Sequence, residues 1–182
     1  MALGEPPSDP GRSWRCRRSP TSTIGGMSRH LGVIRHSRSG TTGILCDAAV
    51  DAARNVVGTS QAVEVRVLGA FDAGPDDVLG ADALLLATPA HFGYMSGALK
   101  DFFERVYLRC LDQTDALPYA LIVKGDTDVE GAVASVQKIA TGMNWQLVLP
   151  PITVVGPVTD ADLERAAELG ATLAAGLGEG IF

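Results

Sequence analysis

The sequence predicts an α/β domain built on a doubly wound, five-stranded parallel sheet. From residue 31 onward, short apolar runs alternate with longer stretches of helical periodicity, which is the pattern of β-strands joined by crossover helices. Two of the apolar runs carry no polar residue until their last position, as expected for central strands covered on both faces. The chain has 182 residues, of which 46% are hydrophobic, so it is long enough to bury one core.

Five runs are expected to be strands, at residues 31–36, 62–68, 83–88, 118–124 and 146–155. The second run alternates apolar and charged residues, which favours an edge strand. The third and fourth are the unbroken apolar strings and should lie in the centre. The fifth contains Pro150 and Pro151, which cannot donate ladder hydrogen bonds, so that this strand must be interrupted or lie at an edge.

Helices are expected between the strands, because apolar residues recur at helical spacing around 45–56, 99–106, 129–143 and 163–177. A shorter crossover helix within 74–80 has a proline at its first position, where proline is well tolerated. Thr159 is the expected N-cap of the last helix, with two aspartates in its first turn. Thr127 and Glu130 have the spacing of a capping box for the helix at 129–143.

The first 30 residues differ from the rest of the chain. They are rich in Pro, Ser, Gly and Arg and show no periodicity, which predicts a disordered tail before a single domain at 31–182. Five arginines against two acids give this segment a net charge of +3. A translation start at Met27 is one hypothesis for the segment, and arginine-rich nucleic-acid binding is the less favoured one.

Composition narrows the possible partners and location. The net charge of −6 should repel polyanions, so we expect neither a nucleic-acid nor a membrane partner. No apolar run reaches the length of a membrane span and no secretory signal is evident, which predicts a cytoplasmic protein. The three cysteines and three histidines are dispersed, which argues against a zinc site or a Ser/His/Asp triad; no metal is expected.

The first candidate site lies between the first strand and the first helix. Backbone N–H groups at a helix N-terminus favour an anion, and neighbouring hydroxyls can donate to phosphate oxygens. The loop lacks the ending of a Walker P-loop and the GxGxxG of a dinucleotide fingerprint. Ordinary turn and cap chemistry is the alternative interpretation. The phosphate-binding candidates are Ser37, Arg38, Ser39, Gly40, Thr41 and Thr42.

The second candidate site follows the third strand and leads into the helix at 99–106. In a sheet of strand order 2-1-3-4-5, the ends of strands 1 and 3 flank the topological switch point, where doubly wound folds bind ligands. A phosphate loop beside aromatic side chains and a close-passing backbone suits a mononucleotide. The ring-binding candidates are Thr88, Pro89, Ala90, His91, Phe92 and Gly93.

Two segments carry a resemblance to known proteins. Ser37-x-x-Gly40-x-Thr42 and the stretch from Thr88 to Phe103 resemble the phosphate loop and the isoalloxazine loop of flavodoxin-like proteins, specifically FMN-dependent NAD(P)H:quinone oxidoreductases and NADPH-dependent FMN reductases. The resemblance covers about residues 31–177. It implies FMN phosphate on the first loop, the flavin ring against 89–93, and further contacts from Lys124, Gly125 and Asp126, where an acidic loop replaces the family's glycine-rich stretch.

The resemblance implies an enzyme that passes electrons from NADH or NADPH through FMN to a quinone or similar small-molecule acceptor, and it implies a homo-oligomer. A flavodoxin-type electron carrier without its own NAD(P)H oxidation is the main alternative, and a flavin-free binding module is a third. A phosphate-accepting receiver domain is disfavoured, because the third strand ends at Thr88 and Pro89 and the first strand ends without an acidic pair.

Individual side chains have two interpretations each. His91 is either a solvent-facing loop residue or the catalytic candidate that helps to protonate a reduced quinone, since imidazole titrates near neutral pH. Arg38 is either solvated or an extra charge for a phosphate. Phe92 and Tyr94 either pack the loop or lie beside the ring. His36 is expected to be a structural neighbour of the phosphate.

Overall fold

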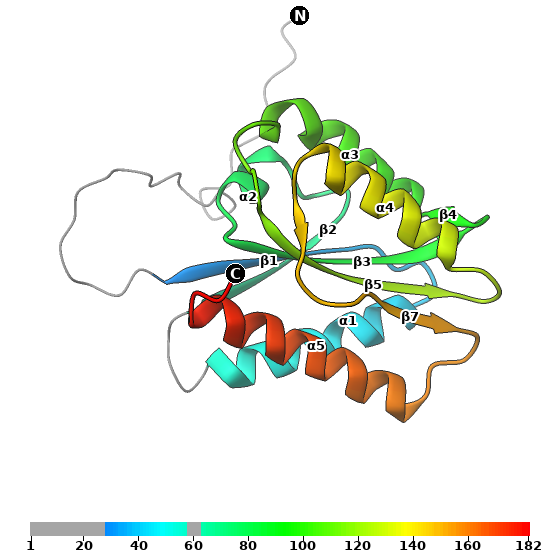
Figure 1. Cartoon of the computed structure of the whole chain (residues 1–182). Helices are drawn as coiled ribbons and strands as arrows, with labels where there is room; N and C mark the ends of the chain where they lie inside the picture. Colours follow the sequence, from blue (N-terminus) through cyan, green and yellow to red (C-terminus); the bar gives the residue numbers. More distant parts are fainter. Residues whose placement is uncertain (1–27, 58–62) are drawn as a thin grey trace, which may run out of the picture.

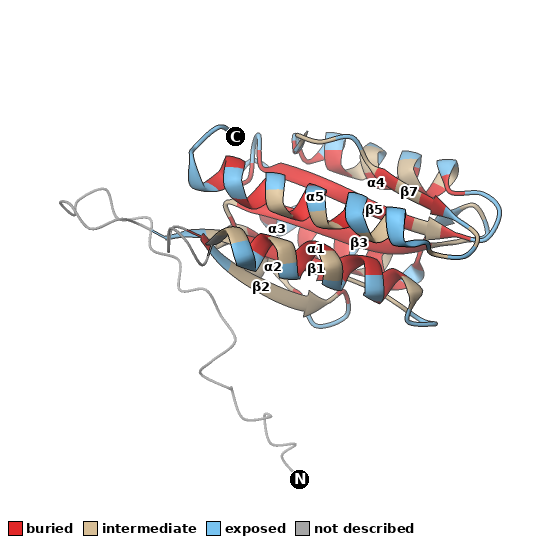
Figure 2. Cartoon of the chain, turned by 90° about the horizontal axis from the view of Figure 1, so that it is seen from below, coloured by how far each residue is buried: buried red, intermediate tan, exposed pale blue. Residues whose placement is uncertain are grey.

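The computed structural model describes residues 28–57 and 63–182. Its elements form three layers, with the sheet in the middle, α1 (Thr41–Val57) and α5 (Asp160–Gly178) on one face, and α2 (Pro75–Leu79), α3 (Gly97–Cys110) and α4 (Glu130–Gly142) on the other (Figure 1). Figure 2 shows buried residues concentrated in the sheet and on the helix faces turned toward it. The α/β class is therefore confirmed.

The sheet has the expected strand order. The strands β1 (Arg29–Arg35), β2 (Val63–Gly69), β3 (Ala83–His91) and β5 (Pro118–Gly125) run parallel in the order β2-β1-β3-β5, with β2 at the edge. The fifth run is split by Pro150 and Pro151 into β6 (Gln146–Leu147) and β7 (Ile152–Val155), and both pieces pair with β5. The interruption predicted from the two prolines is thus observed at the second edge of the sheet.

One strand was not expected from the sequence. The short strand β4 (Tyr94–Met95) pairs antiparallel with the end of β3, so that His91 faces Tyr94 and Ala90 faces Met95. Phe92 and Gly93, between the paired residues His91 and Tyr94, form the tight turn of this hairpin at the carboxyl end of β3. The second predicted loop is therefore a regular, hydrogen-bonded projection of the sheet.

The predicted N-cap of α5 is confirmed, and the predicted N-terminal capping box of α4 is not. Thr159 caps α5 by accepting a hydrogen bond from Asp162 N–H, and Asp162 completes a capping box. The capping box predicted for Thr127 and Glu130 is wrong, because α4 has Val129 at its N-cap position. The buried Val129 fixes the chain there, and Asp128 Oδ1 instead accepts from Glu130 N–H at 2.9 Å.

The domain begins slightly earlier than residue 31. Arg29 and His30 belong to β1, where they lie opposite Val63 and Glu64 of β2. Asp82 holds this end of the strand, since its Oδ2 accepts from His30 N–H at 2.8 Å and its Oδ1 lies 3.4 Å from Arg29 Nη1. Residues 1–27 of the predicted tail, including Met27, lie outside the described residues.

The sheet separates two apolar cores. Alternate side chains of β3 enter opposite cores, with Leu84 and Leu86 packed beneath α2, α3 and α4, and Leu85 packed beneath α1 and α5. Cys46 and Cys110 are buried, one in each core. Burial raises the pKa of both thiols to about 11, so both stay protonated and behave as packing residues.

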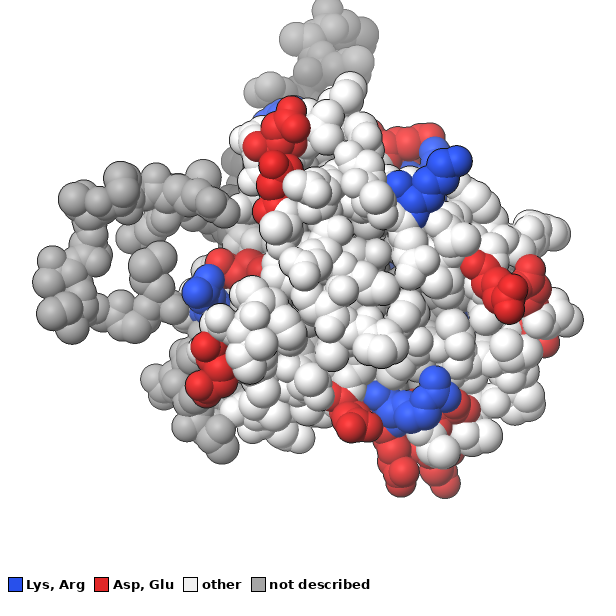
Figure 3. Space-filling view, viewed as in Figure 1, with Lys and Arg blue, Asp and Glu red and all other residues white. Residues whose placement is uncertain are grey.

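The surface carries charges of both signs. On the face seen in Figure 3, acidic and basic side chains form small separate groups over a largely uncharged surface. In residues 28–57 and 63–182, no helix combines the length and apolarity that a bilayer span requires. The same residues contain no cluster of three His, Cys, Asp or Glu side chains suited to a metal ion.

The close contact between α1 and α5 gives a stability prediction. A Cβ added at Gly170 would lie 2.0 Å from the carbonyl oxygen of Ala49, so Gly170→Ala must push the two helices apart. We expect a loss of about 1–3 kcal/mol in unfolding free energy, the usual cost of overpacking, measured by urea denaturation. Gly97→Ala is the matched control, because a Cβ there meets nothing within 4 Å. Equal stability of both variants would contradict the prediction.

Candidate functional site

Three loops meet at the carboxyl edge of the sheet, where β1, β3 and β5 end. The rings of His36, after β1, and His91, at the end of β3, lie edge to face with their centroids 6.4 Å apart. A Cβ added at Gly125, at the end of β5, would lie 3.1 Å from Ala90 Cβ. The convergence of the loops after β1 and β3, predicted from the strand order, is therefore observed, and the loop at 124–128, implied by the family resemblance, lies beside them.

The loop after β1 leads directly into the first turn of α1. Gly40 has a φ of +91°, which glycine adopts without strain, and its carbonyl accepts from Ile44 N–H at 3.0 Å. Ser37 Oγ accepts from Gly43 N–H at 3.1 Å, and Ser39 Oγ lies 3.1 Å from Thr41 Oγ1. The first-turn amides of Thr41 and Thr42 have no acceptor within the helix. This is the geometry of an anion site.

The predicted phosphate residues differ in exposure. Arg38, Ser39 and Gly40 are exposed, and Thr41 is half-buried, so these four can meet a ligand directly. Thr42 is buried within the helix turn. Ser37 is half-buried and uses its hydroxyl to hold Gly43. The loop hydroxyls that do not hold the backbone of α1 are therefore those of exposed Ser39 and half-buried Thr41.

The hairpin after β3 presents an aromatic side chain at its tip. Phe92 and Gly93 both have positive φ, at 54° and 69°, as in the tightest two-residue hairpin turns. A positive φ is unfavourable for a bulky aromatic residue, yet the Phe92 side chain is fully exposed and contributes nothing to the core. The fold therefore holds an apolar ring in solvent at the edge where the three loops meet.

The hairpin is anchored from beneath by buried hydroxyls. Thr88 Oγ1 accepts from Ser96 N–H at 3.1 Å, and Ser135 Oγ of α4 accepts from Met95 N–H at 3.2 Å. A Cβ added at Gly131 would lie 2.0 Å from Gly93 O, so α4 touches the hairpin tip. Thr88 and Pro89, both predicted to bind the cofactor, are buried at the hairpin base and position the exposed tip.

The loop after β5 adds a charged rim. Lys124 forms an ion pair with Asp126, and this hydrogen bond and its charge lower the pKa of the Asp126 carboxyl. Gly125 is enclosed, because an added Cβ would lie 2.8 Å from Val129 Cγ1. This segment can therefore offer its backbone and the Lys124–Asp126 pair to a ligand held against the hairpin.

The pKa of His36 is shifted by its position at this edge. Partial burial lowers its pKa, and the positive charges of His91 and Arg38 lower it further, so the imidazole is neutral at pH 7. Its Nδ1 atom is buried without a hydrogen-bond partner among the described residues. Because an unpaired lone pair is less costly there than an unpaired N–H, we infer that Nε2 carries the proton.

A cavity of about 440 Å³ lies on the β2 side of the phosphate loop. Its walls come from the loop after β1, the first turns of α1 and the turn between β2 and α2. The sequence reasoning missed the contribution of this turn, although strand order 2-1-3 places the end of β2 beside that of β1. The lining residues not predicted are Arg35, Gly43, Ile44, Asp47, Gly69, Ala70, Phe71 and Asp72.

Comparisons with known proteins agree with this geometry. Residues 70–158 match the family model of NADPH-dependent FMN reductases. A flavodoxin from Aquifex aeolicus (strain VF5) is 35% identical over 74 residues, which are 41% of this chain and 38% of the relative. The chain therefore matches well under half of that curated relative's length.

Solved structures share the whole fold. A flavodoxin from the domain Archaea superposes with a TM-score of 0.70 at 17% identity, covering 81% of this chain and 98% of the other. A flavodoxin, WrbA-like protein from Agrobacterium tumefaciens gives a TM-score of 0.64 at 18% identity, covering 81% and 96%. The flavodoxin-like fold and the resemblance to the flavodoxin-like FMN reductases are confirmed.

The histidine pair gives a prediction for titration by NMR. In His91→Gln, loss of the neighbouring positive charge should raise the His36 pKa, because that charge is one of the causes that lower it. The His36 ring C–H shift measured against pH reports this directly. His30→Gln, at the opposite end of β1, is the control and should leave the His36 curve in place. An unchanged His36 curve in His91→Gln would show that the rings do not interact.

Proposed function

From the flavodoxin-like fold and the match of residues 70–158 to the NADPH-dependent FMN reductases, we propose that this chain is an FMN-binding oxidoreductase. It takes electrons from NADH or NADPH and passes them to a quinone or similar small-molecule acceptor. The observation that carries the proposal is the meeting of an anion-binding helix start with an exposed aromatic hairpin at one sheet edge.

The loop after β1 fits the phosphate of FMN. The first-turn amides of Thr41 and Thr42, which have no acceptor within the helix, and the positive end of the helix dipole favour a phosphate dianion. The hydroxyls of Ser39 and Thr41 are 3.1 Å apart and exposed enough to donate to its oxygens. Arg38, also exposed, adds a positive charge at the same place.

The hairpin and the loop after β5 fit the flavin ring. Exposed Phe92 and partly exposed Tyr94 offer apolar faces, and the backbone of residues 90–93 passes nearby with no large side chain at Gly93. Residues 124–126 close the other side with the Lys124–Asp126 pair. A planar, amphipathic ring is the ligand that such a mixed lining selects.

The bound FMN would supply hydride acceptance from the nicotinamide and onward electron transfer, and the chain's residues bind, orient and supply protons. Neutral His36 holds its donor at Nε2, beside the phosphate loop. His91 lies at the hairpin, where it can deliver a proton to the acceptor as that acceptor is reduced. We further propose a homo-oligomer that acts in the cytoplasm without nucleic-acid or membrane partners.

A flavodoxin-type carrier is the second candidate, favoured by the near-complete coverage of a solved flavodoxin by this chain. A carrier would accept electrons only from a partner protein. The two functions differ in whether the pyridine nucleotide itself reduces the flavin.

Removing the hydroxyls of Ser39 and Thr41 should weaken binding of FMN. We expect Ser39→Ala/Thr41→Ala to lose at least about tenfold in FMN affinity, since each hydrogen bond to a charged group contributes roughly 1.5–3 kcal/mol. Quenching of flavin fluorescence on titration of the apoprotein measures the dissociation constant. Riboflavin, which lacks the phosphate, is the control ligand and should bind both proteins equally. Equal loss for both flavins would place the phosphate elsewhere.

Direct reduction distinguishes the enzyme from the carrier. FMN-loaded protein is mixed anaerobically with NADPH or NADH in a stopped-flow instrument. If the protein is an enzyme, the flavin absorbance at about 450 nm is lost without any further protein. If the flavin is bleached only after a reductase protein is added, the chain is an electron carrier and the proposed enzyme activity is wrong. Dithionite serves as the control reductant, because it should bleach the flavin in either case.

A further inference from the structure

We propose that Arg105 is a positioning residue for the candidate site, which holds the turn between β2 and α2 so that Phe71 lies against the His36 ring. Arg105 belongs to α3 and is not among the residues that line the cavity of about 440 Å³ beside the phosphate loop. It therefore reaches the site only through other residues. The inference deepens the proposed function and rests on it for the role of His36 beside the FMN phosphate.

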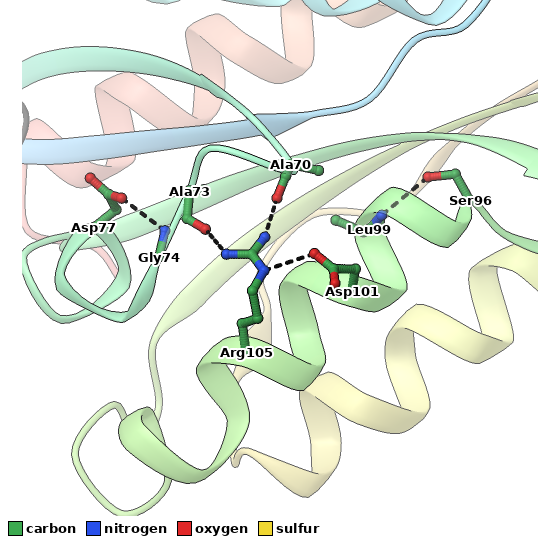
Figure 4. A network of polar contacts seen from close by, with 8 residues as sticks. All are labelled: Ala70, Ala73, Gly74, Asp77, Ser96, Leu99, Asp101 and Arg105. Carbon is green, nitrogen blue, oxygen red and sulfur yellow. Dashed lines mark hydrogen bonds and ion pairs between the residues drawn. The ribbon is translucent and has the colours of Figure 1, made fainter. Parts of the chain in front are cut away.

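The Arg105 guanidinium binds the turn at two points. Its Nη2 donates to the carbonyl oxygen of Ala70 at 2.6 Å, and its Nη1 donates to that of Ala73 (Figure 4). Its Nε donates to Asp101 Oδ2 at 2.7 Å, one helical turn earlier in α3, and this contact orients the guanidinium plane. A planar fork of N–H donors makes all three contacts at once, which a lysine ammonium cannot reproduce.

The same turn is tied to the end of β1. Ala70 N–H donates to Arg35 O at 2.8 Å, and Arg35 directly precedes His36 in the chain. Gly69 O accepts from Ala73 N–H at 3.0 Å, which closes the turn on itself. The turn is therefore held by β1 at its start and by the guanidinium of α3 at two of its carbonyls.

Phe71 lies in the chain between the two carbonyls that the guanidinium binds. Its side chain is 67% exposed, so the path of the backbone has more influence on its position than packing in the core. Its ring lies edge to face with the His36 imidazole, with the centroids 6.0 Å apart and the planes at 74°. Such ring pairs favour particular relative orientations. A shift of the turn should therefore separate Phe71 from His36.

The His36 imidazole depends on its ring neighbours for its orientation. One neighbour is Phe71, and the other is His91, with centroids 6.4 Å apart. The Nδ1 atom of His36 is buried and has no hydrogen-bond partner in the part of the chain that the structure describes. His36 and Phe71 line the same cavity as Ser37 of the phosphate loop. The contacts thus run from Arg105 through Phe71 to an imidazole beside the phosphate site.

Arg105 is expected to act through geometry and not through its charge. Partial burial is the largest cause of the lowered His36 pKa, and the charges that lower it further are those of His91 and Arg38. The other charged residues that line the cavity are Arg35, Asp47 and Asp72. All of these groups stay in place when Arg105 is replaced, so a moved turn acts through burial. Lost burial raises the His36 pKa toward its ordinary value of 6.5.

Arg105→Lys tests the geometry, because it keeps the positive charge and loses the fork. We expect loss of the nuclear Overhauser effects between the ring protons of Phe71 and His36, and movement of the His36 titration curve to higher pH, both measured by NMR on the full chain. Arg109→Lys is the matched control, since Arg109 is an exposed arginine one turn later in α3. Unchanged ring contacts and an unchanged curve in Arg105→Lys would overturn the proposal.

A double variant shows whether Arg105 acts through Phe71. Phe71→Leu removes the aromatic ring at an exposed position and leaves the guanidinium contacts in place, so the His36 curve should again move to higher pH. If the contacts act in series, Arg105→Lys/Phe71→Leu should move the curve no further than Phe71→Leu alone. A double shift equal to the sum of the two single shifts would show that Arg105 acts by a separate route, and the proposal would be wrong.

Binding of FMN separates this proposal from the function on which it rests. We expect Arg105→Lys to raise the Kd for FMN about 3–10-fold, the effect of losing one oriented ring contact beside the phosphate. Quenching of flavin fluorescence measures it, and riboflavin, which lacks the phosphate, should bind both proteins equally. If the unaltered chain binds no FMN, the proposed function fails, and the NMR results still decide whether Arg105 places His36. If both proteins bind FMN equally although the ring contacts are lost, the proposed role of Arg105 at the site is wrong.

Discussion

The pairing of β3 on both sides is the constraint on which the site depends. Its first seven residues are buried, and it pairs with β1 and β5 in parallel register, placing Arg35 opposite Ala87 and Pro89 opposite Lys124. All three strands consequently end at one edge, although the loops that follow them are about 50 and 35 residues apart in sequence. Only β3 continues past that edge, as the hairpin with β4 that bears the exposed aromatic tip.

The sequence was sufficient for the parts of the fold that rest on local periodicity and on residues with strong backbone preferences. Unbroken apolar runs indicated the central strands, alternation indicated the edge strand β2, and Pro150 and Pro151 indicated the split at the other edge. The hairpin was not predictable in the same way, because Phe92 adopts a positive φ against its own preference. Contacts with Gly131 and Ser135, about 40 residues further on, hold it there.

The site residues were predicted from their chemical type. Their burial in the structure distinguishes those that can meet a ligand from those that support the loops. Ser39, in the first loop, and Thr88, at the end of the third strand, were both predicted to bind the cofactor, yet Ser39 is exposed in the loop after β1 and Thr88 is buried beneath the hairpin. The lowered pKa of His36 depends partly on His91, which only the folded sheet brings near. The turn between β2 and α2, which carries Phe71, was not predicted to line a cavity for the same reason. The contacts of Arg105 with the carbonyls of Ala70 and Ala73, which hold this turn, join segments more than 30 residues apart.

The edge thus combines a closely packed backbone with a few exposed side chains. Gly125, Gly131 and the buried hydroxyl of Thr88 fit their surroundings so closely that changes there alter the path of the chain. Phe71 and Phe92 are largely exposed, so substitutions there should cost the fold little. Ligand preference can therefore vary at these exposed positions while the packed frame of the sheet edge stays constant.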